Sequence, residues 1–155
     1  MDRANLMIEF NNPHHAEIVA DACKAILNKE YDHCISRTKN GELLGGGIFT
    51  NYTGRSVCMH IASFDPSWLN RDLLWVAFHY PFVQLKCQKI LAMVPANNHR
   101  ALEFDKKLGF KEETIIRDVY NTGDMIVLSM YKDDCRWLKL KPKTIAETEY
   151  DDGWR

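Results

Sequence analysis

The sequence lacks the features of an exported or membrane-spanning chain. Its cysteines are odd in number, lie far apart and form no CxxC pair, so they predict neither a disulfide framework nor a zinc knuckle. They are Cys23, Cys34, Cys58, Cys87 and Cys135. The longest apolar runs, such as Leu73 to Phe78, are far shorter than the roughly 20 residues of a bilayer span. Met1 to Phe10 contains no basic region followed by an apolar one. We therefore expect a protein of a reducing cytoplasm, without a membrane partner.

Neither sign of charge dominates. The 155 residues include 20 Lys plus Arg and 21 Asp plus Glu, which gives a formal net charge of −1. This balance argues against bulk attraction to nucleic acid or to an anionic membrane, although a local basic face stays open. The chain is 46% hydrophobic and contains 4 Trp, 6 Tyr and 7 Phe, which is enough apolar side chain for one packed domain and too much for intrinsic disorder.

The first half of the chain predicts one helix and four strands. The strands are expected over residues 6–10, 31–38, 43–52 and 56–64. Asn12 and Pro13 supply an N-cap and a first helical residue, and apolar residues follow at helical spacing as far as Ile26. Asn40 and Gly41 form a tight hairpin turn. Three glycines, residues 45–47, fall inside a strand, which indicates either close approach of a ligand, a bulge, or plain close packing of another backbone.

The second half predicts two helices and three strands. The helices are expected over residues 70–86 and 98–108, and the strands over 89–94, 110–119 and 125–131. Pro81 must kink the first of these helices or end its first part. Gly109 stands where a left-handed C-cap is expected. The strand over 89–94 is fully apolar, as buried strands are.

This order of elements predicts an α+β fold, a three-layer α/β arrangement. Helices cover a mixed, mostly antiparallel sheet with one parallel crossover through residues 70 to 94. We expect a single domain over residues 1–138 and a C-terminal extension over 139–155. The extension is either solvated and partly ordered, or an arm that packs on a second subunit of a homodimer through Tyr150 and Trp154.

One segment resembles a known family. Asn98 to Phe110 reads N-H-R-A-L-E-F-D-K-K-L-G-F and follows the apolar strand Ile90 to Val94. It resembles the N-x-x-A-x-x-x-Y-x-K-x-G-F segment of the GCN5-related N-acetyltransferases, whose order of elements also matches residues 5 to 131. The run Phe64 to Trp75, together with Tyr80 to Phe82, resembles a compact subgroup of these proteins met in tailed phages. That resemblance implies an infected bacterial cytoplasm as the location.

The resemblance implies an acyl-CoA site, for acetyl-CoA or another acyl-CoA, between splayed central parallel strands. Splayed strands leave backbone N–H and C=O groups unpaired, and the amides of pantetheine can pair with them. A backbone N–H near residues 61–63 would bind the oxyanion. The cofactor-binding residues implied are Ile61, Ala62, Ser63, Asn70, Arg71, Asp72, Leu73, Asn98, Ala101 and Phe104. Trp68 could face the adenine or a substrate, or pack in the core.

The expected phosphate site departs from the family pattern. The pyrophosphate would lie on backbone N–H groups at the start of the helix that follows the first splayed strand. The family's loop reads R/Q-x-x-G-x-G/A, whereas residues 68–74 contain no glycine. Arg71 offers a phosphate contact. Asp72 repels an anion unless it is a first-turn cap that points away.

Three residues are candidate catalytic groups. Attack of an amine on a thioester needs a base, an oxyanion donor and a proton for the thiolate. His60 is the first candidate base, with a hydrogen-bonded core histidine as the alternative. Asp65 is the second, with a helix cap as the alternative. Asp105 stands where many members of the family have a tyrosine that protonates the thiolate, and a carboxyl can do so only if burial raises its pKa.

Three functions stay open. The first is an N-acyltransferase acting on an amine of a protein, a small molecule or a nucleobase. The second is a weak or inactive acetyltransferase-like fold that binds a host or partner protein. The third is a nucleic-acid-associated enzyme with a basic face made of Lys86, Lys89, Arg100, Lys106, Lys107 and Lys111. Cys58 is either a nucleophile beside His60 or a buried structural cysteine.

We expect no metal site. The residues that could be mistaken for a metal cluster are His14, His15, His33 and Cys34. Neighbouring helical side chains such as His14 and His15 point about 100° apart, so they rarely share one ion.

Overall fold

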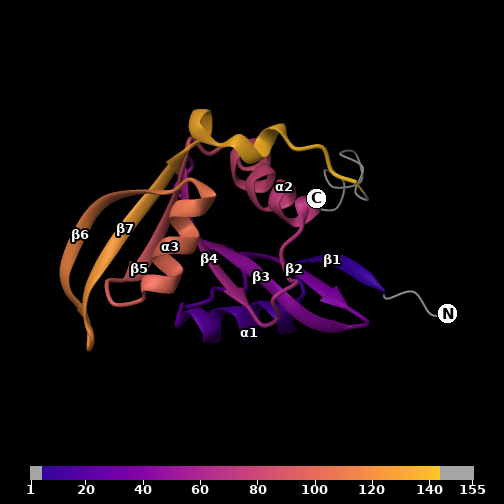
Figure 1. The fold of residues 1–155 in the computed structure, drawn as a ribbon, viewed down its shortest axis with the longest axis horizontal. Coiled ribbons are helices and arrows are strands. Elements are labelled where there is room, and N and C mark those ends of the chain that lie inside the picture. The colour runs from indigo at the N-terminus through magenta and orange to yellow at the C-terminus, as the bar shows by residue number, and fades with distance from the viewer. Residues whose placement is uncertain (1–4, 144–155) are drawn as a thin grey trace.

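A seven-stranded sheet organises the computed structural model, which describes residues 5–143 (Figure 1). The strands are β1 (Leu6–Phe10), β2 (His33–Lys39), β3 (Glu42–Thr50), β4 (Ser56–Ser63), β5 (Lys89–Pro95), β6 (Lys111–Tyr120) and β7 (Gly123–Tyr131). Their order in the sheet is β1-β2-β3-β4-β5-β7-β6, and all neighbours are antiparallel except β4 and β5. The helices are α1 (Pro13–Cys23), α2 (Arg71–His79) and α3 (His99–Leu108). The α+β prediction and its mixed sheet are confirmed.

Helix α1 begins as expected and ends early. The side chain of Asn12 accepts hydrogen bonds from the first free backbone N–H groups, and Pro13 is the first helical residue. Lys24 then adopts a left-handed conformation, with φ of 54°, and its N–H returns to carbonyl oxygens of the last turn. The prediction that Ile26 continues the apolar face of this helix is wrong, because Ile26 lies beyond the cap and is 92% exposed.

Helix α2 changes form at its proline. The α-helix ends at His79, and Tyr80–Gln84 form a π-helical turn closed by the bond from the Leu85 N–H to the Tyr80 carbonyl, at 2.9 Å. Pro81 has no N–H to continue the α-helical ladder. Of the two alternatives that the sequence left for Pro81, a kink or an end of the first part of the helix, the structure shows the second.

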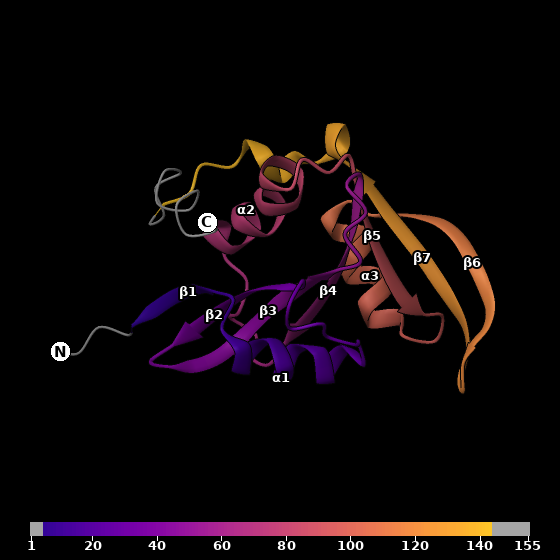
Figure 2. The same ribbon diagram turned by 180° about the vertical axis from the view of Figure 1, so that it is seen from behind.

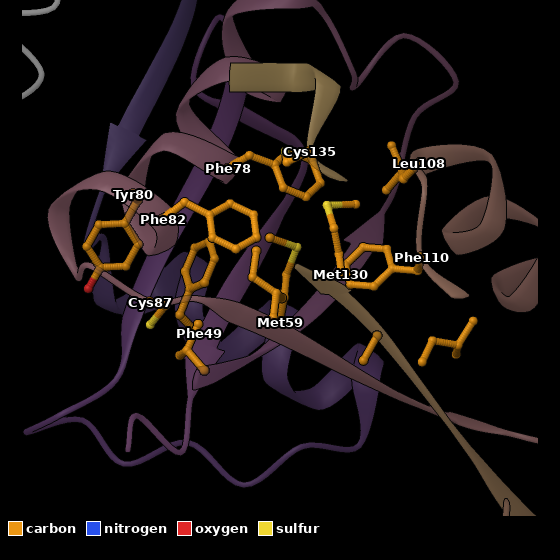
Figure 3. Close-up of a cluster of buried hydrophobic side chains, with 14 of the residues drawn as sticks. Phe49, Met59, Phe78, Tyr80, Phe82, Cys87, Leu108, Phe110, Met130 and Cys135 are labelled. Atoms are coloured by element: carbon orange, nitrogen blue, oxygen red, sulfur yellow. The ribbon is translucent and has the colours of Figure 1, made fainter. Parts of the chain in front are cut away.

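Helices α1 and α2 cover opposite faces of the sheet (Figures 1 and 2). The larger core lies between the sheet and α2 and contains the buried aromatic rings of Phe49, Phe78 and Phe82 (Figure 3). A smaller core under α1 joins Val19 to Ile48. After β7, the chain packs against the end of α3, where the Trp137 indole N–H donates a hydrogen bond to the Leu108 carbonyl at 2.7 Å. These layers fix the positions of the central strands.

Strands β4 and β5 separate after a short paired stretch. They are in register only from Ser56 opposite Lys89 to Cys58 opposite Leu91. Beyond these pairs β4 stays with β3 and β5 stays with β7, so the two parallel strands diverge. The splay predicted for the central parallel strands is therefore present (Figure 2).

Close packing accounts for two of the three consecutive glycines in β3. A Cβ on Gly45 would lie 2.8 Å from the ring of Trp68, and a Cβ on Gly46 would lie 2.3 Å from the carbonyl oxygen of Ile35. Neither position leaves room for a side chain. Of the alternatives that the sequence left open, close packing applies to Gly45 and Gly46.

The proposed C-terminal extension is described only at its start. Residues 132–134 and 136–139 form short 3-10 turns, and Leu140 packs against the main core. Tyr150 and Trp154, which were expected to pack on a partner, lie outside the described residues. The domain boundary at residue 138 stays a prediction. In the described part of the chain, no helix is long and apolar enough to cross a membrane.

Candidate active site

A cleft opens where β4 and β5 diverge. Its volume is about 650 Å³. Its walls are residues 59–63 of β4, 92–95 of β5 and 22–24 at the end of α1, with Asn98, Ala101, Phe104 and Asp105 at α3. The cleft therefore brings together eight of the thirteen site residues from the sequence analysis, namely His60, Ile61, Ala62, Ser63, Asn98, Ala101, Phe104 and Asp105.

The backbone of β4 presents alternate peptide groups to the cleft. A Cβ on Gly47 would lie 3.2 Å from the His60 carbonyl oxygen, so that carbonyl points toward β3. The Ile61 carbonyl points the other way, since it accepts a hydrogen bond from the Cys23 thiol at 3.3 Å. A strand residue directs its N–H and C=O to the same side. The N–H of Ile61 therefore faces the cleft, whereas that of Ala62 faces β3.

His60 is held at the edge of the cleft by a polar contact. Its Nε2 lies 3.1 Å from the hydroxyl oxygen of Thr50 on β3. Burial lowers the pKa of His60, and the negative charge of Asp32 opposes that shift only in part. The imidazole is therefore neutral at neutral pH, which is the form able to accept a proton.

Asp105 is a buried carboxyl in the same cleft. Its side chain comes from α3 and is 8% exposed. Burial raises the pKa of Asp105 to about 7. The pKa of Cys23, on the opposite wall, rises to about 11 through burial and, in smaller part, the charge of Asp105. The condition on which the sequence allowed Asp105 as an acid is therefore met, because half of its carboxyls carry a proton near pH 7.

Asn98 holds the turn between β5 and α3. Its Oδ1 accepts the N–H of Ala101 at 3.2 Å, so it is the N-cap of α3. Gly109, with φ of 113°, ends the same helix. This helix places Ala101 and Phe104 on the cleft wall.

Asp65 does not line the cleft. Its carboxylate accepts hydrogen bonds from the N–H of Ser67 at 2.8 Å and from the Ser67 hydroxyl at 2.6 Å. Those bonds lower the pKa of Asp65, so it stays ionised and holds a turn. Arg37 fixes the same loop from β2, since its guanidinium donates to the carbonyl oxygens of Ser67 and Trp68.

The start of α2 also lies outside the cleft. The Asn70 side chain accepts the N–H of Leu73 at 2.8 Å and so caps the helix. Asp72 is buried and accepts the backbone N–H of Lys143 at 2.6 Å. Arg71 is exposed. The carboxylate of Asp72 thus points toward the C-terminal segment. This is the orientation in which an acidic residue of the first turn would not repel an anion bound at the helix start.

Several residues of the cleft wall were not predicted as site residues, among them Cys23, Lys24, Arg100 and Thr122. Cys23 and Lys24 reach it because α1 ends there, in a left-handed cap without the glycine that would have marked it. Thr122, from the turn between β6 and β7, also lines the cleft. Arg100 lines the cleft too, whereas the sequence analysis named it only as part of a basic face. Their positions depend on tertiary packing, for which the sequence carries no local signal.

Cys58 and part of the expected basic face take part in packing and in ion pairs. Cys58 is buried, and burial raises the pKa of its thiol, which favours the structural interpretation. Within the expected basic face, Lys106 pairs with Glu112 at 2.9 Å and Lys89 pairs with Glu113 at 2.5 Å. Across residues 5–143, no three His, Cys, Asp or Glu side chains gather in a way that could hold a metal ion.

Comparison with solved structures identifies the fold. A mutant form of the spermidine N-acetyltransferase SpeG from Vibrio cholerae superposes with a TM-score of 0.66 at 16% identity, over 86% of this chain and 96% of that one. The N-acetyltransferase PseH from Campylobacter jejuni gives a TM-score of 0.56 at 17% identity, over 82% of this chain and 98% of that one. No protein-family model and no curated protein sequence matches the chain. The chain has the α+β fold of the GCN5-related N-acetyltransferases.

Proposed function

We propose that the protein is an acyl-CoA-dependent N-acyltransferase that transfers an acetyl group from acetyl-CoA to an amine of a protein, a small molecule or a nucleobase. The observation that carries this proposal is the cleft of about 650 Å³ between β4 and β5. Beyond Cys58 its β4 wall does not pair with β5, so peptide groups there are available to the amides of an extended pantetheine, which can bind as an added strand would.

The side chains of the cleft can divide the chemistry between them. His60, neutral and oriented by Thr50, takes a proton from the attacking amine. The amine nitrogen bonds to the thioester carbon, and the N–H of Ile61 stabilises the negative charge on the oxygen. The carbon–sulfur bond then breaks, and protonated Asp105 supplies the proton for the departing thiolate.

The proposal also places the phosphate end of the cofactor. We place the pyrophosphate at the start of α2, where Arg71 is exposed and the helix dipole favours an anion. Asn70 and Leu73 form the cap beside it, and Asn98, Ala101 and Phe104 would contact the cofactor from α3.

Titration of the full chain with acetyl-CoA, followed by calorimetry, tests the proposal. Micromolar binding supports it, and absence of binding at millimolar acetyl-CoA overturns it. Native mass spectrometry of the protein shows whether CoA is retained from expression. Amines are then screened for acetyl transfer, with spermidine included because a structurally similar protein bears that substrate in its name.

A second candidate function is supported by the start of α2. A protein that has lost catalysis and binds a host or partner protein would not need a phosphate site there. The buried carboxylate of Asp72 and its bond to Lys143 are consistent with such a loss. Failure to bind acetyl-CoA, together with recovery of one stoichiometric partner from the host, would favour this candidate over the enzyme.

We also propose the bacterial cytoplasm as the location, and an origin in the tailed-phage subgroup that the sequence resembles. The five cysteines are free, which is consistent with a reducing compartment. Two further proposals remain from the sequence. A homodimer is tested by the mass in solution, and nucleic-acid binding is tested by affinity for DNA and RNA at low salt.

A further inference from the structure

A second, smaller cavity adjoins the cleft. It lies between the sheet and α2, has a volume of about 30 Å³, and is lined only by apolar residues. Four of these residues also line the cleft, namely Met59, Ile61, Trp68 and Phe104. The two spaces therefore share a wall, in which the rings of Trp68 and Phe104 lie 5.8 Å apart.

Small residues keep this cavity open. Gly47 lies on its β3 wall, on the face of the sheet that α2 covers, and contributes no side chain to it. Ala77 faces it from α2 and is the smallest side chain on that helix wall. A void in an otherwise packed core forfeits dispersion contacts, and an apolar void does not hold water well. An apolar group of the right size would regain those contacts.

We infer that this cavity receives the alkyl end of an acyl group longer than acetyl, a four-carbon chain such as butyryl. The inference rests on the proposed function and names the acyl donor of that same cleft. Its carbonyl end would lie at the N–H of Ile61, which is on the shared wall. A cavity of about 30 Å³ has roughly twice the space that one water needs, which suits two further methylene-sized groups.

Calorimetric titration of the full chain with acetyl-, propionyl-, butyryl- and octanoyl-CoA tests the inference. Burial of each added methylene tightens binding about fourfold, so butyryl-CoA should bind about 15-fold more tightly than acetyl-CoA. Octanoyl-CoA should show no further gain, because its chain exceeds the cavity. Equal affinities for acetyl- and butyryl-CoA would overturn the inference and leave the proposed function standing. Absence of binding for every acyl-CoA would overturn the proposed function itself.

A variant that fills the cavity links the preference to this site. Ala77→Leu should abolish the gain for butyryl-CoA and leave the affinity for acetyl-CoA unchanged, whereas Ala77→Ser, which keeps the volume, should retain the gain. A butyryl preference that survives Ala77→Leu would overturn the inference. If Ala77→Leu lowers the melting temperature too far for titration, Leu74→Phe, a change on the same helix wall, serves as the second filling variant.

Discussion

The Nε2 atom of His60 lies 3.1 Å from the hydroxyl oxygen of Thr50 on the neighbouring strand. When Nε2–H donates to this oxygen, Nδ1 carries the lone pair and is free to accept a proton. In this tautomer, a threonine hydroxyl on β3 leaves Nδ1 as the nitrogen of the cleft histidine that can act as a base. This pairing gives Thr50 the part of a positioning residue in the proposed reaction.

Thr50→Val should lower kcat about tenfold and leave the KM for acetyl-CoA unchanged, because valine keeps the shape and removes the oxygen. His60→Ala should lower kcat by about 100-fold, the usual size of a general-base effect. Steady-state rates as a function of pH make the test. Thr50→Ser is the matched control and should restore the rate. Since burial lowers the pKa of His60, the fall of the wild-type kcat/KM on the acid side should begin only below pH 6.5. Undiminished turnover in His60→Ala would exclude His60 as the base.

Asp105→Asn should change how stability depends on pH. Burial raises the pKa of Asp105 from 3.8 to about 7, so the folded protein binds the proton more tightly than the unfolded chain does. Its stabilising contribution is complete below pH 4 and is lost as the pH rises through 7. From pH 5 to pH 8 the loss is about 2 to 3 kcal/mol.

Urea unfolding at pH 5 and pH 8 measures this difference, and the asparagine variant should show a flatter profile than the wild type. The same substitution should reduce acyl transfer and remove the decline in kcat above pH 7. The raised pKa of Asp105 would be contradicted if the free energy of unfolding changed from pH 5 to pH 8 by the same amount in the wild type and in Asp105→Asn.

Asn98→Ala should destabilise the protein by about 1 kcal/mol, because α3 loses its N-cap bond to the Ala101 N–H. Asn98→Asp keeps the cap and should retain stability. Comparison of the two variants separates capping from cofactor contact. If Asn98 also binds acetyl-CoA, both variants should weaken the calorimetric affinity. Unchanged affinity in Asn98→Asp would remove the proposed cofactor contact.

Gly46→Ala should destabilise the protein by more than about 2 kcal/mol, since the new Cβ would lie 2.3 Å from the backbone carbonyl oxygen of Ile35. Gly47→Ala, in the same strand, meets its nearest atom at 3.2 Å and should cost less. Guanidinium unfolding of both variants gives the comparison. A Gly46 variant as stable as the wild type would show that β2 and β3 can move apart.

The sequence was most informative where a local signal sets the backbone. Asn12 and Pro13 start α1, Gly109 ends α3, and Pro81 ends the α-helical part of α2, and each prediction rests on one conformational rule. The end of α1 had no such signal, because Lys24 adopts the left-handed conformation that glycine would have announced.

The candidate site was predictable along β4 and at α3, but not at the start of α2. The resemblance to the acetyltransferases led us to assign His60 and Ile61 on β4, and Asn98 before α3, to one site, and all three line the cleft. Asp65 and Asn70 were attached to the same site by their order in the chain, yet their oxygens hold a turn and a cap. The direction of the loop between them depends on Arg37, which lies some thirty residues earlier in the sequence.

Strand β6 forms one edge of the sheet, and residues 111–119 are exposed along it. A flat, apolar edge of this length would recruit further strands and lead to aggregation. Here the register with β7 is interrupted twice, and Asp118 adopts a left-handed conformation with φ of 57°. Charged residues occupy half of the ten positions of β6, namely Lys111, Glu112, Glu113, Arg117 and Asp118. The irregular, charged edge therefore keeps the chain from polymerising through this strand, even though it carries the exposed side chains of Ile115 and Ile116.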